Sequence, residues 1–130
     1  MDKDWRDAVQ HGDIEQLRER LDSGADINAR DRHGQTGLMI AAGHGRVNVV
    51  RLLIERGALL DHTAKYGLSA IMLAVVNGHV EIVRMLAQAG ADLALRGTGA
   101  PGFHDKTALD LAEARGDAAM IEVLRGGISQ

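Results

Sequence analysis

The stretch QTGLMIAAGHGRVNVVRLLIERG, residues 35–57, is one copy of a pattern that recurs along the chain every 33 residues. Two glycine positions and four apolar positions share this interval, a coincidence that is hard to obtain by chance. The recurring sets are Gly12, Gly45 and Gly78; Gly24, Gly57 and Gly90; Trp5, Leu38 and Ile71; Ala8, Ala41 and Ala74; Ile14, Val47 and Val80; and Leu17, Val50 and Val83. A period of about 20 to 50 residues indicates a solenoid of stacked units.

Within this copy the sequence predicts two short helices joined by a glycine turn. Thr36 is a helix N-cap by type, and the apolar run after it stops at Gly43-His44-Gly45. From Val47 onwards apolar residues recur at helical spacing until Gly57, which is typical of a C-cap. The next ten residues carry turn signals and predict a hairpin-like connection. Because one unit cannot bury its own apolar face, the units must stack.

These residues resemble the ankyrin repeat, whose unit combines a glycine turn, Thr-Pro-Leu-His, an alanine pair, Gly-His, an apolar helix and Gly-Ala-Asp. The resemblance covers about residues 5–125 and implies an all-α ankyrin-repeat solenoid, with stacked helix-turn-helix units joined by hairpin-like loops. The matching residues are Gly34, Thr36, Leu38, Ala41, Ala42, Gly45, Gly57 and Ala58 in one copy, and Gly67, Ser69, Ala74, Gly78, His79, Gly90, Ala91 and Asp92 in the next.

The chain departs from the family pattern in two slots. The proline slot holds Gly37, Ala70 and Ala108, and the histidine slot holds Met39, Met72 and Asp110. In the family this histidine hydrogen-bonds the hairpin backbone, so we expect that bracing to be replaced or missing here.

A single domain spanning residues 1–130 is expected, and its last unit breaks the period. Thr107 follows Ser69 by 38 residues, so five residues are inserted. The insertion is either a functional loop or a tolerated one, and Phe103 favours function. The expected parts are an N-terminal capping unit at 1–30, repeats at 31–63 and 64–96, a C-terminal capping repeat at 97–125 with the inserted loop 97–106, and a tail at 126–130.

Composition excludes several classes of protein. The chain has no cysteine and no apolar run of signal-peptide or membrane-spanning length, which predicts a cytoplasmic protein without disulfides. No serine, histidine and aspartate set lies in a catalytic context, and the Gly43–Gly45 segment is a repeat turn, not a phosphate loop. We therefore expect no enzymatic activity and no cofactor. The six histidines form no close ligand pair, so no metal is expected, and His79 is interpreted as structural.

The resemblance implies a binding surface, because ankyrin partners are usually held by the hairpin tips and the exposed side of the first helices, which line a concave face. Tyr66 and Phe103 stand out there as two of only three aromatics in the chain. The residues in these slots are Gln10 and His11; Arg32, His33, Gln35 and His44; Lys65, Tyr66, Leu68, Val76 and Asn77; and Phe103, His104, Lys106 and Arg115.

Charge predicts the chemistry of the partner. The formal net charge is −3, yet these slots hold arginine, lysine and histidine and no carboxylate. A basic groove on an acidic protein favours a partner protein with an acidic segment. Protonation of His11, His33, His44 and His104 below about pH 6.5 would strengthen that binding. We expect a monomer that contacts no membrane and no nucleic acid.

The main interpretation is a non-enzymatic protein-protein interaction module, and two alternatives stay open. The first is a dedicated regulatory, accessory or immunity-like partner of one enzyme. Small stand-alone ankyrin proteins of bacteria resemble this chain in length, and 12 arginines against 3 lysines fit a GC-rich genome. The second is nucleic-acid binding through the basic groove, which net acidity, few aromatics and a pI near 6.0 disfavour.

Overall fold

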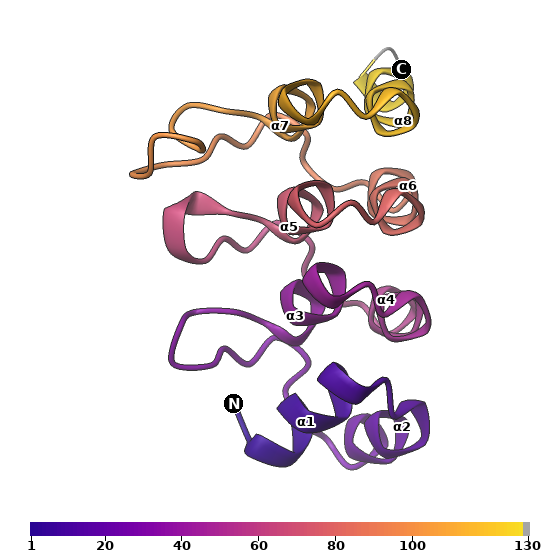
Figure 1. The fold of residues 1–130 in the computed structure, drawn as a ribbon. Coiled ribbons are helices and arrows are strands. Elements are labelled where there is room, and N and C mark those ends of the chain that lie inside the picture. The colour runs from indigo at the N-terminus through magenta and orange to yellow at the C-terminus, as the bar shows by residue number, and fades with distance from the viewer. Residues whose placement is uncertain (129–130) are drawn as a thin grey trace.

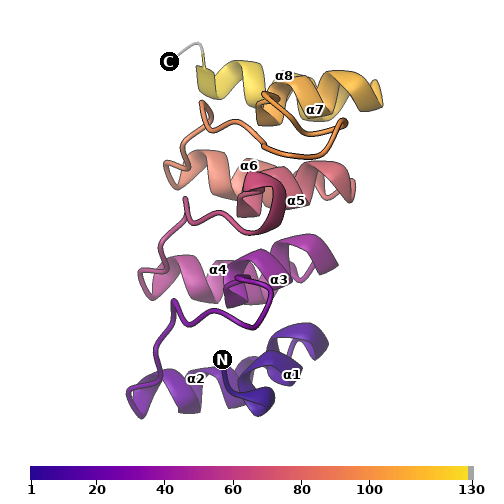
Figure 2. The same ribbon diagram turned by 90° about the vertical axis from the view of Figure 1, so that its left-hand side faces the viewer.

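A computed structural model describes residues 1–128, and Ser129 and Gln130 lie outside the described residues. Figures 1 and 2 show helix pairs stacked along one axis, with loops projecting to one side between successive pairs. The structure confirms the all-α solenoid. The elements are α1 (Lys3–His11), α2 (Ile14–Asp22), α3 (Gly37–His44), α4 (Val47–Glu55), the 3-10 turn η1 (Lys65–Gly67), α5 (Ala70–Val76), α6 (Val80–Gln88), α7 (Ala108–Arg115) and α8 (Ala118–Ile128).

The first helix of each full repeat begins at a hydroxyl cap. The Met39 N–H donates to Thr36 Oγ1 at 3.3 Å, and the Met72 N–H donates to Ser69 Oγ at 3.4 Å. In the last unit, the Asp110 carboxylate also accepts from the Thr107 N–H at 3.0 Å, which completes a capping box. In each of these three units, the first helix therefore begins at the residue directly after the hydroxyl cap.

Stacking buries the apolar registers that the sequence predicts. Leu38 and Ile71 are 1% and 2% exposed, and the alanine layer formed by Ala41 and Ala74 is fully buried. Trp5 is 3% exposed, which confirms its predicted place in the core. The helices α1, α3, α5 and α7 form one layer and α2, α4, α6 and α8 a second one behind them (Figure 1).

Trp5 also explains one departure from the family pattern. A Cβ atom at Gly37 would lie 3.0 Å from Trp5 Nε1, so a residue with a side chain at the start of α3 would press against the indole. The glycine in this proline slot therefore accommodates the large ring that the first unit places beneath it.

The last helix differs from the predicted boundary. The sequence places the end of the array at Gly126-Gly127, whereas α8 runs on to Ile128. Glycine lowers helix stability by about 1 kcal/mol relative to alanine but adopts helical dihedral angles without strain, so the pair does not end the helix.

Candidate functional site

The last residues of the first helices form a row along the stack. His11, His44 and Asn77 are exposed, and each lies one 33-residue period from the next. His11 Nδ1 lies 2.8 Å from the Asp7 carbonyl, and His44 Nδ1 lies 3.0 Å from the Ile40 carbonyl. Because a carbonyl only accepts, both contacts require a proton on Nδ1 and leave Nε2 toward solvent. Asn77 Nδ2 donates in the same way to its own helix, to the Leu73 carbonyl at 2.8 Å.

A second set of side chains connects each repeat to the one before it. Arg46 Nε donates to the Gln10 carbonyl at 2.7 Å, and Arg115 donates to the Val76 carbonyl at 3.0 Å. Between them, His79 Nε2 lies 3.2 Å from the Gly43 carbonyl, which confirms the structural role predicted for this histidine. Each contact satisfies a carbonyl at the C-terminus of the preceding first helix. Arg115, a predicted partner contact, therefore also has a structural role.

The first hairpin presents three predicted contacts on a braced turn. Arg32 and His33 are exposed and Gln35 is half-buried. The carboxylate of Asp31 accepts from the His33 and Gln35 N–H groups at 2.8 and 3.0 Å, which fixes the turn.

Arg30 replaces the bracing that the family assigns to the missing histidine. Its Nη1 donates to the carbonyls of Gly34, at 3.0 Å, and of Thr63, at 2.9 Å, and its Nη2 lies 2.6 Å from His62 Nδ1. One guanidinium thus joins the tip of the first hairpin to the start of the second. At the junction of the first two hairpins, the bracing is therefore replaced.

The second hairpin and the inserted loop meet at their tips. Tyr66 and Phe103 pack with ring centroids 5.8 Å apart, and Lys65 Nζ lies 4.9 Å from the tyrosine ring centroid. The two aromatics that the sequence places at hairpin tips are therefore each other's packing partners. Tyr66 stays 37% exposed, and Phe103 is half-buried.

Leu68 is a second correction. It is 7% exposed and belongs to the hydrophobic core, so its side chain offers nothing to a partner. The reason is its position directly before Ser69, where the chain already turns inward to begin α5. The other predicted residue of this hairpin, Lys65, is exposed, as are His104 and Lys106 of the inserted loop.

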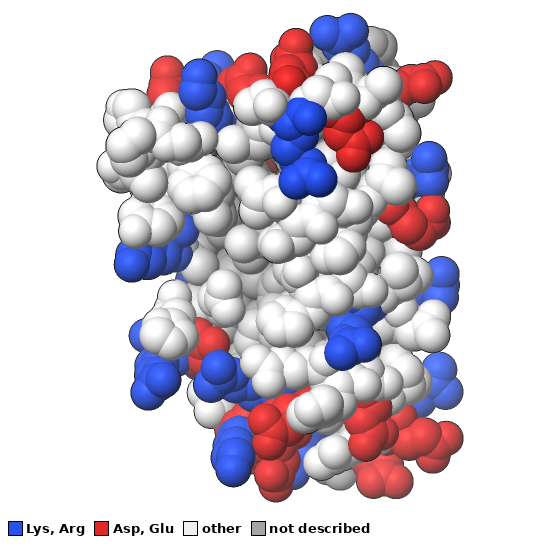
Figure 3. Space-filling view, viewed as in Figure 1, with Lys and Arg blue, Asp and Glu red and all other residues white. Residues whose placement is uncertain are grey.

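Charge is distributed differently from the predicted basic groove. Figure 3 shows Lys and Arg projecting on the hairpin side, while the middle of the same face is largely free of charged residues. The row of His11, His44 and Asn77 contributes polar groups without a fixed charge. Positive charge therefore lies on the hairpins and also at the helix ends, where Arg46 and Arg115 are exposed.

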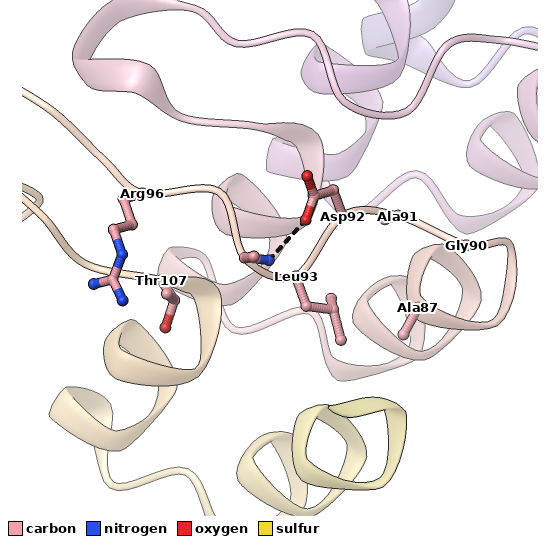
Figure 4. A pocket seen from close by; sticks show the side chains of 8 residues that line it. Ala87, Gly90, Ala91, Asp92, Leu93, Arg96 and Thr107 are labelled. Carbon is pink, nitrogen blue, oxygen red and sulfur yellow. Dashed lines mark hydrogen bonds between the residues drawn. The ribbon is translucent and has the colours of Figure 1, made fainter. Parts of the chain in front are cut away.

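The sequence does not reveal the cleft shown in Figure 4. It has a volume of about 660 Å³ and lies between the end of α6, the segment after it and the start of α7. Its walls are mainly apolar, and Ala87 stands in the register of Ile54, so a smaller side chain leaves room there. Asp92 at its edge accepts from the Ala94 N–H at 2.9 Å, and Arg96 donates to the Asp105 carbonyl at 2.8 Å. The cleft holds none of the predicted contact residues.

The two carboxyl groups with shifted pKa values lie at helix N-termini. A backbone hydrogen bond from Thr107 lowers the pKa of Asp110, and one from Asp4 lowers that of Asp2. Both carboxylates cap helix N-termini, which is a structural use. Within residues 1–128, no three His, Asp or Glu side chains gather as a metal site, and no helix has the length and apolarity to cross a membrane.

Comparison with protein families decides the classification. A family model described as ankyrin repeats, in three copies, matches residues 6–97. The chain belongs to the ankyrin-repeat family. Ankyrin repeats are generally protein-protein interaction modules and typically lack enzymatic activity. The match ends at Gly97, so it covers neither most of the inserted loop nor the helix pair α7 and α8. No curated protein matches the chain.

Proposed function

We propose that this ankyrin-repeat chain is a non-enzymatic module that holds a partner protein on the face formed by its hairpins and the ends of its first helices. The observation that carries the proposal is the exposure of two sets of side chains: His11, His44 and Asn77 at the ends of the first helices, and the cationic hairpin residues Arg32 and Lys65. The helix-end side chains are already held by hydrogen bonds to their own helices, so binding costs little side-chain entropy.

The partner is a protein with an acidic segment. Arg32 and Lys65 project from neighbouring hairpins, whereas the nearby Asp31 carboxylate is engaged by the backbone of its own turn. A carboxylate-bearing segment complements this surface and would be steered towards it, with an on-rate that falls as salt rises.

Affinity capture tests the proposal. The immobilised chain is compared with a variant carrying Arg32→Ala, His44→Ala and Tyr66→Ala, which alters two hairpins and one helix end. The matched control carries Arg18→Ala, Arg51→Ala and Arg84→Ala, three exposed arginines at one register of the second helices. We expect a protein that the wild type and the control capture and the first variant loses. Retention by the first variant and loss by the control would place binding on the other side of the stack.

The same capture separates the alternatives. One dominant partner that proves to be an enzyme identifies a dedicated regulatory, accessory or immunity-like protein, whereas several partners identify a general module. Nucleic acid captured and released by moderate salt would contradict the proposal.

Binding should also respond to pH. His11 and His44 each use Nδ1 within their own helix. Histidine as a residue type gains positive charge as the pH falls through the neutral range. Affinity for an acidic partner is therefore expected to rise between about pH 8 and pH 6. Affinity that is flat over this range, measured by calorimetry in matched buffers, would contradict the charge argument.

A further inference from the structure

The inserted loop is built against the second hairpin. The Thr98 N–H donates to the Tyr66 carbonyl at 2.6 Å, in addition to the contact between the Tyr66 and Phe103 rings. Gly67 permits this approach, because a Cβ atom there would lie 3.2 Å from the Arg96 carbonyl oxygen and 3.3 Å from the Thr98 N. Gly97 permits the fold of the loop itself, because a Cβ atom there would clash with the Phe103 carbonyl. The loop is therefore a formed element whose packing depends on these glycines.

Tyr66 has an unfavourable backbone conformation at this contact. Its φ is 64° and its ψ is 20°, which is the left-handed region. Glycine adopts that region freely and aspartate, as at Asp105, tolerates it, but an aromatic residue does so at a cost in energy. Strained residues of this kind cluster at ligand clamps. An aromatic side chain is kept here although glycine would suit the backbone better.

Lys65, Tyr66, Gly99 and Phe103 together form a surface that we call the tip platform. Phe103 supports the ring of Tyr66 from one side, and Lys65 supplies a cation 4.9 Å from its centroid. Lys65 forms no ion pair within the described residues, whereas the neighbouring Asp105 carboxylate lies 3.7 Å from Arg96. Lys65 Nζ lies over the Tyr66 ring, so the platform offers a 37% exposed aromatic ring together with a cation that has no ion-pair partner among the described residues.

We propose that the tip platform is the specificity-determining site for the partner, and that it takes an acidic peptide segment with an apolar side chain. The apolar side chain packs on the Tyr66 ring, and a flanking carboxylate pairs with Lys65. This inference rests on the proposed function and narrows it, because it places recognition on the contact that the inserted loop creates. The row of His11, His44 and Asn77 then contributes less to the choice of partner than the tip platform does.

Chemical-shift mapping on the full 15N-labelled chain tests the inference. The probe is the blocked peptide Glu-Glu-Leu-Glu-Glu, with Glu-Glu-Ala-Glu-Glu and Gln-Gln-Leu-Gln-Gln as comparisons. We expect saturable shifts at Lys65, Tyr66, Thr98 and Gly99, and weaker binding of both comparison peptides, because each lacks one of the two groups that the platform recognises.

Variants separate recognition from folding. Tyr66→Gly removes the ring and suits the left-handed backbone, so affinity should fall by about tenfold with little change in Tm. Leu59→Ala removes another exposed large apolar side chain, 53% exposed and not part of the tip platform, and should leave affinity unchanged. Lys65→Gln keeps the ring and should weaken binding of the glutamate peptides while sparing the glutamine one.

Two results would overturn the inference. Shifts confined to His11, His44 and Asn77 would move the site to the helix ends, and the proposed function would stand. An absence of saturable shifts with the glutamate-leucine peptide would refute the platform chemistry. A failure of the proposed function would give a different result in the capture experiment. There the control with the Arg18, Arg51 and Arg84 substitutions would lose the partner, and the variant with the Arg32, His44 and Tyr66 substitutions would retain it.

Discussion

Gly45 shows how one residue couples two repeats. Its φ is +76°, and a Cβ atom there would lie 2.7 Å from His79 Cε1. His79 also contacts the Gly43 carbonyl, so the same imidazole touches two points of one turn. Gly57 provides a comparison, because its φ is +83° but a Cβ atom there would meet no atom within 4 Å.

Gly45→Ala should therefore cost more stability than Gly57→Ala. A left-handed alanine costs about 1 kcal/mol in either turn. At Gly45 the imidazole must also move and its hydrogen bond weakens, which brings the expected loss to about 2 kcal/mol. Urea unfolding of the two variants measures the difference. Equal losses would mean that the contact with His79 contributes nothing.

Asp110 gives the capping box a dependence on pH. A backbone hydrogen bond from Thr107 holds the pKa of its carboxyl below the ordinary value of 3.8, and the charges of Lys106 and Arg96 add to the effect. Because the pKa is lowered by folding, the resulting stability is present above pH 3.8 and is lost as pH falls through the folded-state pKa.

Asp110→Ala is expected to cost about 1 kcal/mol at neutral pH, the usual value of a helix cap. The difference in free energy of unfolding between wild type and variant should shrink as the pH falls below 3.8, the ordinary aspartate value. Denaturant titrations at several acidic pH values measure it. If the difference in free energy of unfolding stays constant through this range, the charge of the carboxylate does not contribute to the stability of the capping box.

At the scale of elements, Arg30 determines how two hairpins are held together. Arg30→Ala removes its contacts with Gly34, Thr63 and His62 and should cost about 1 to 2 kcal/mol. Arg32→Ala is the control, because the Arg32 side chain is exposed and its one hydrogen bond to the described residues is with His33, at 3.3 Å. The free energy of unfolding of this variant should stay within about 0.5 kcal/mol of the wild-type value. Thermal unfolding compares them. Equal stability of the two variants would show that Arg30 does not hold the two hairpins together.

The elements also show what sequence can predict. Helix starts at Thr36 and Ser69 and the buried registers of Leu38 and Ile71 depend on spacing within one repeat, so the pattern predicts them correctly. The brace from Arg30 and the pairing of Tyr66 with Phe103 depend on contacts between hairpins. The inserted residues have no register in the other repeats, and nothing local indicates where they pack.

The same reason explains the outcome at the candidate site. Exposure of His11, His44 and Arg32 follows from their place in the repeat and agrees with the prediction. Burial of Leu68 and the shared role of Arg115 depend on how one repeat contacts the next, which the spacing of a single repeat does not contain.

At the scale of the whole molecule, the outer face of the last unit differs from the inner ones. Glu113 stands in the register of Val75, which is fully buried between repeats, and Arg125 stands in that of Ala87. Glu113 Oε2 and Arg125 Nη2 lie 3.4 Å apart on this outer face. Charged residues thus replace the apolar ones that bind the inner repeats together.

Glu113→Val with Arg125→Ile should make the chain self-associate, because it restores an apolar stacking face that no repeat covers. The control is Glu81→Val with Arg84→Ile, which removes the exposed 2.8 Å ion pair on α6. We expect the wild type and the control to sediment as monomers. The average mass of the first variant should increase with protein concentration. A monomeric first variant would show that these two charges do not cap the stack.

Partners are expected to bind the side of the stack that carries the hairpins and the ends of the first helices. Hydrogen-deuterium exchange of the chain, free and with its captured partner, measures which side becomes protected. Protection is expected at residues 30–36, 63–68 and 97–106 and at the ends of α1, α3 and α5. Protection confined to the second helices α2, α4 and α6 would contradict the account.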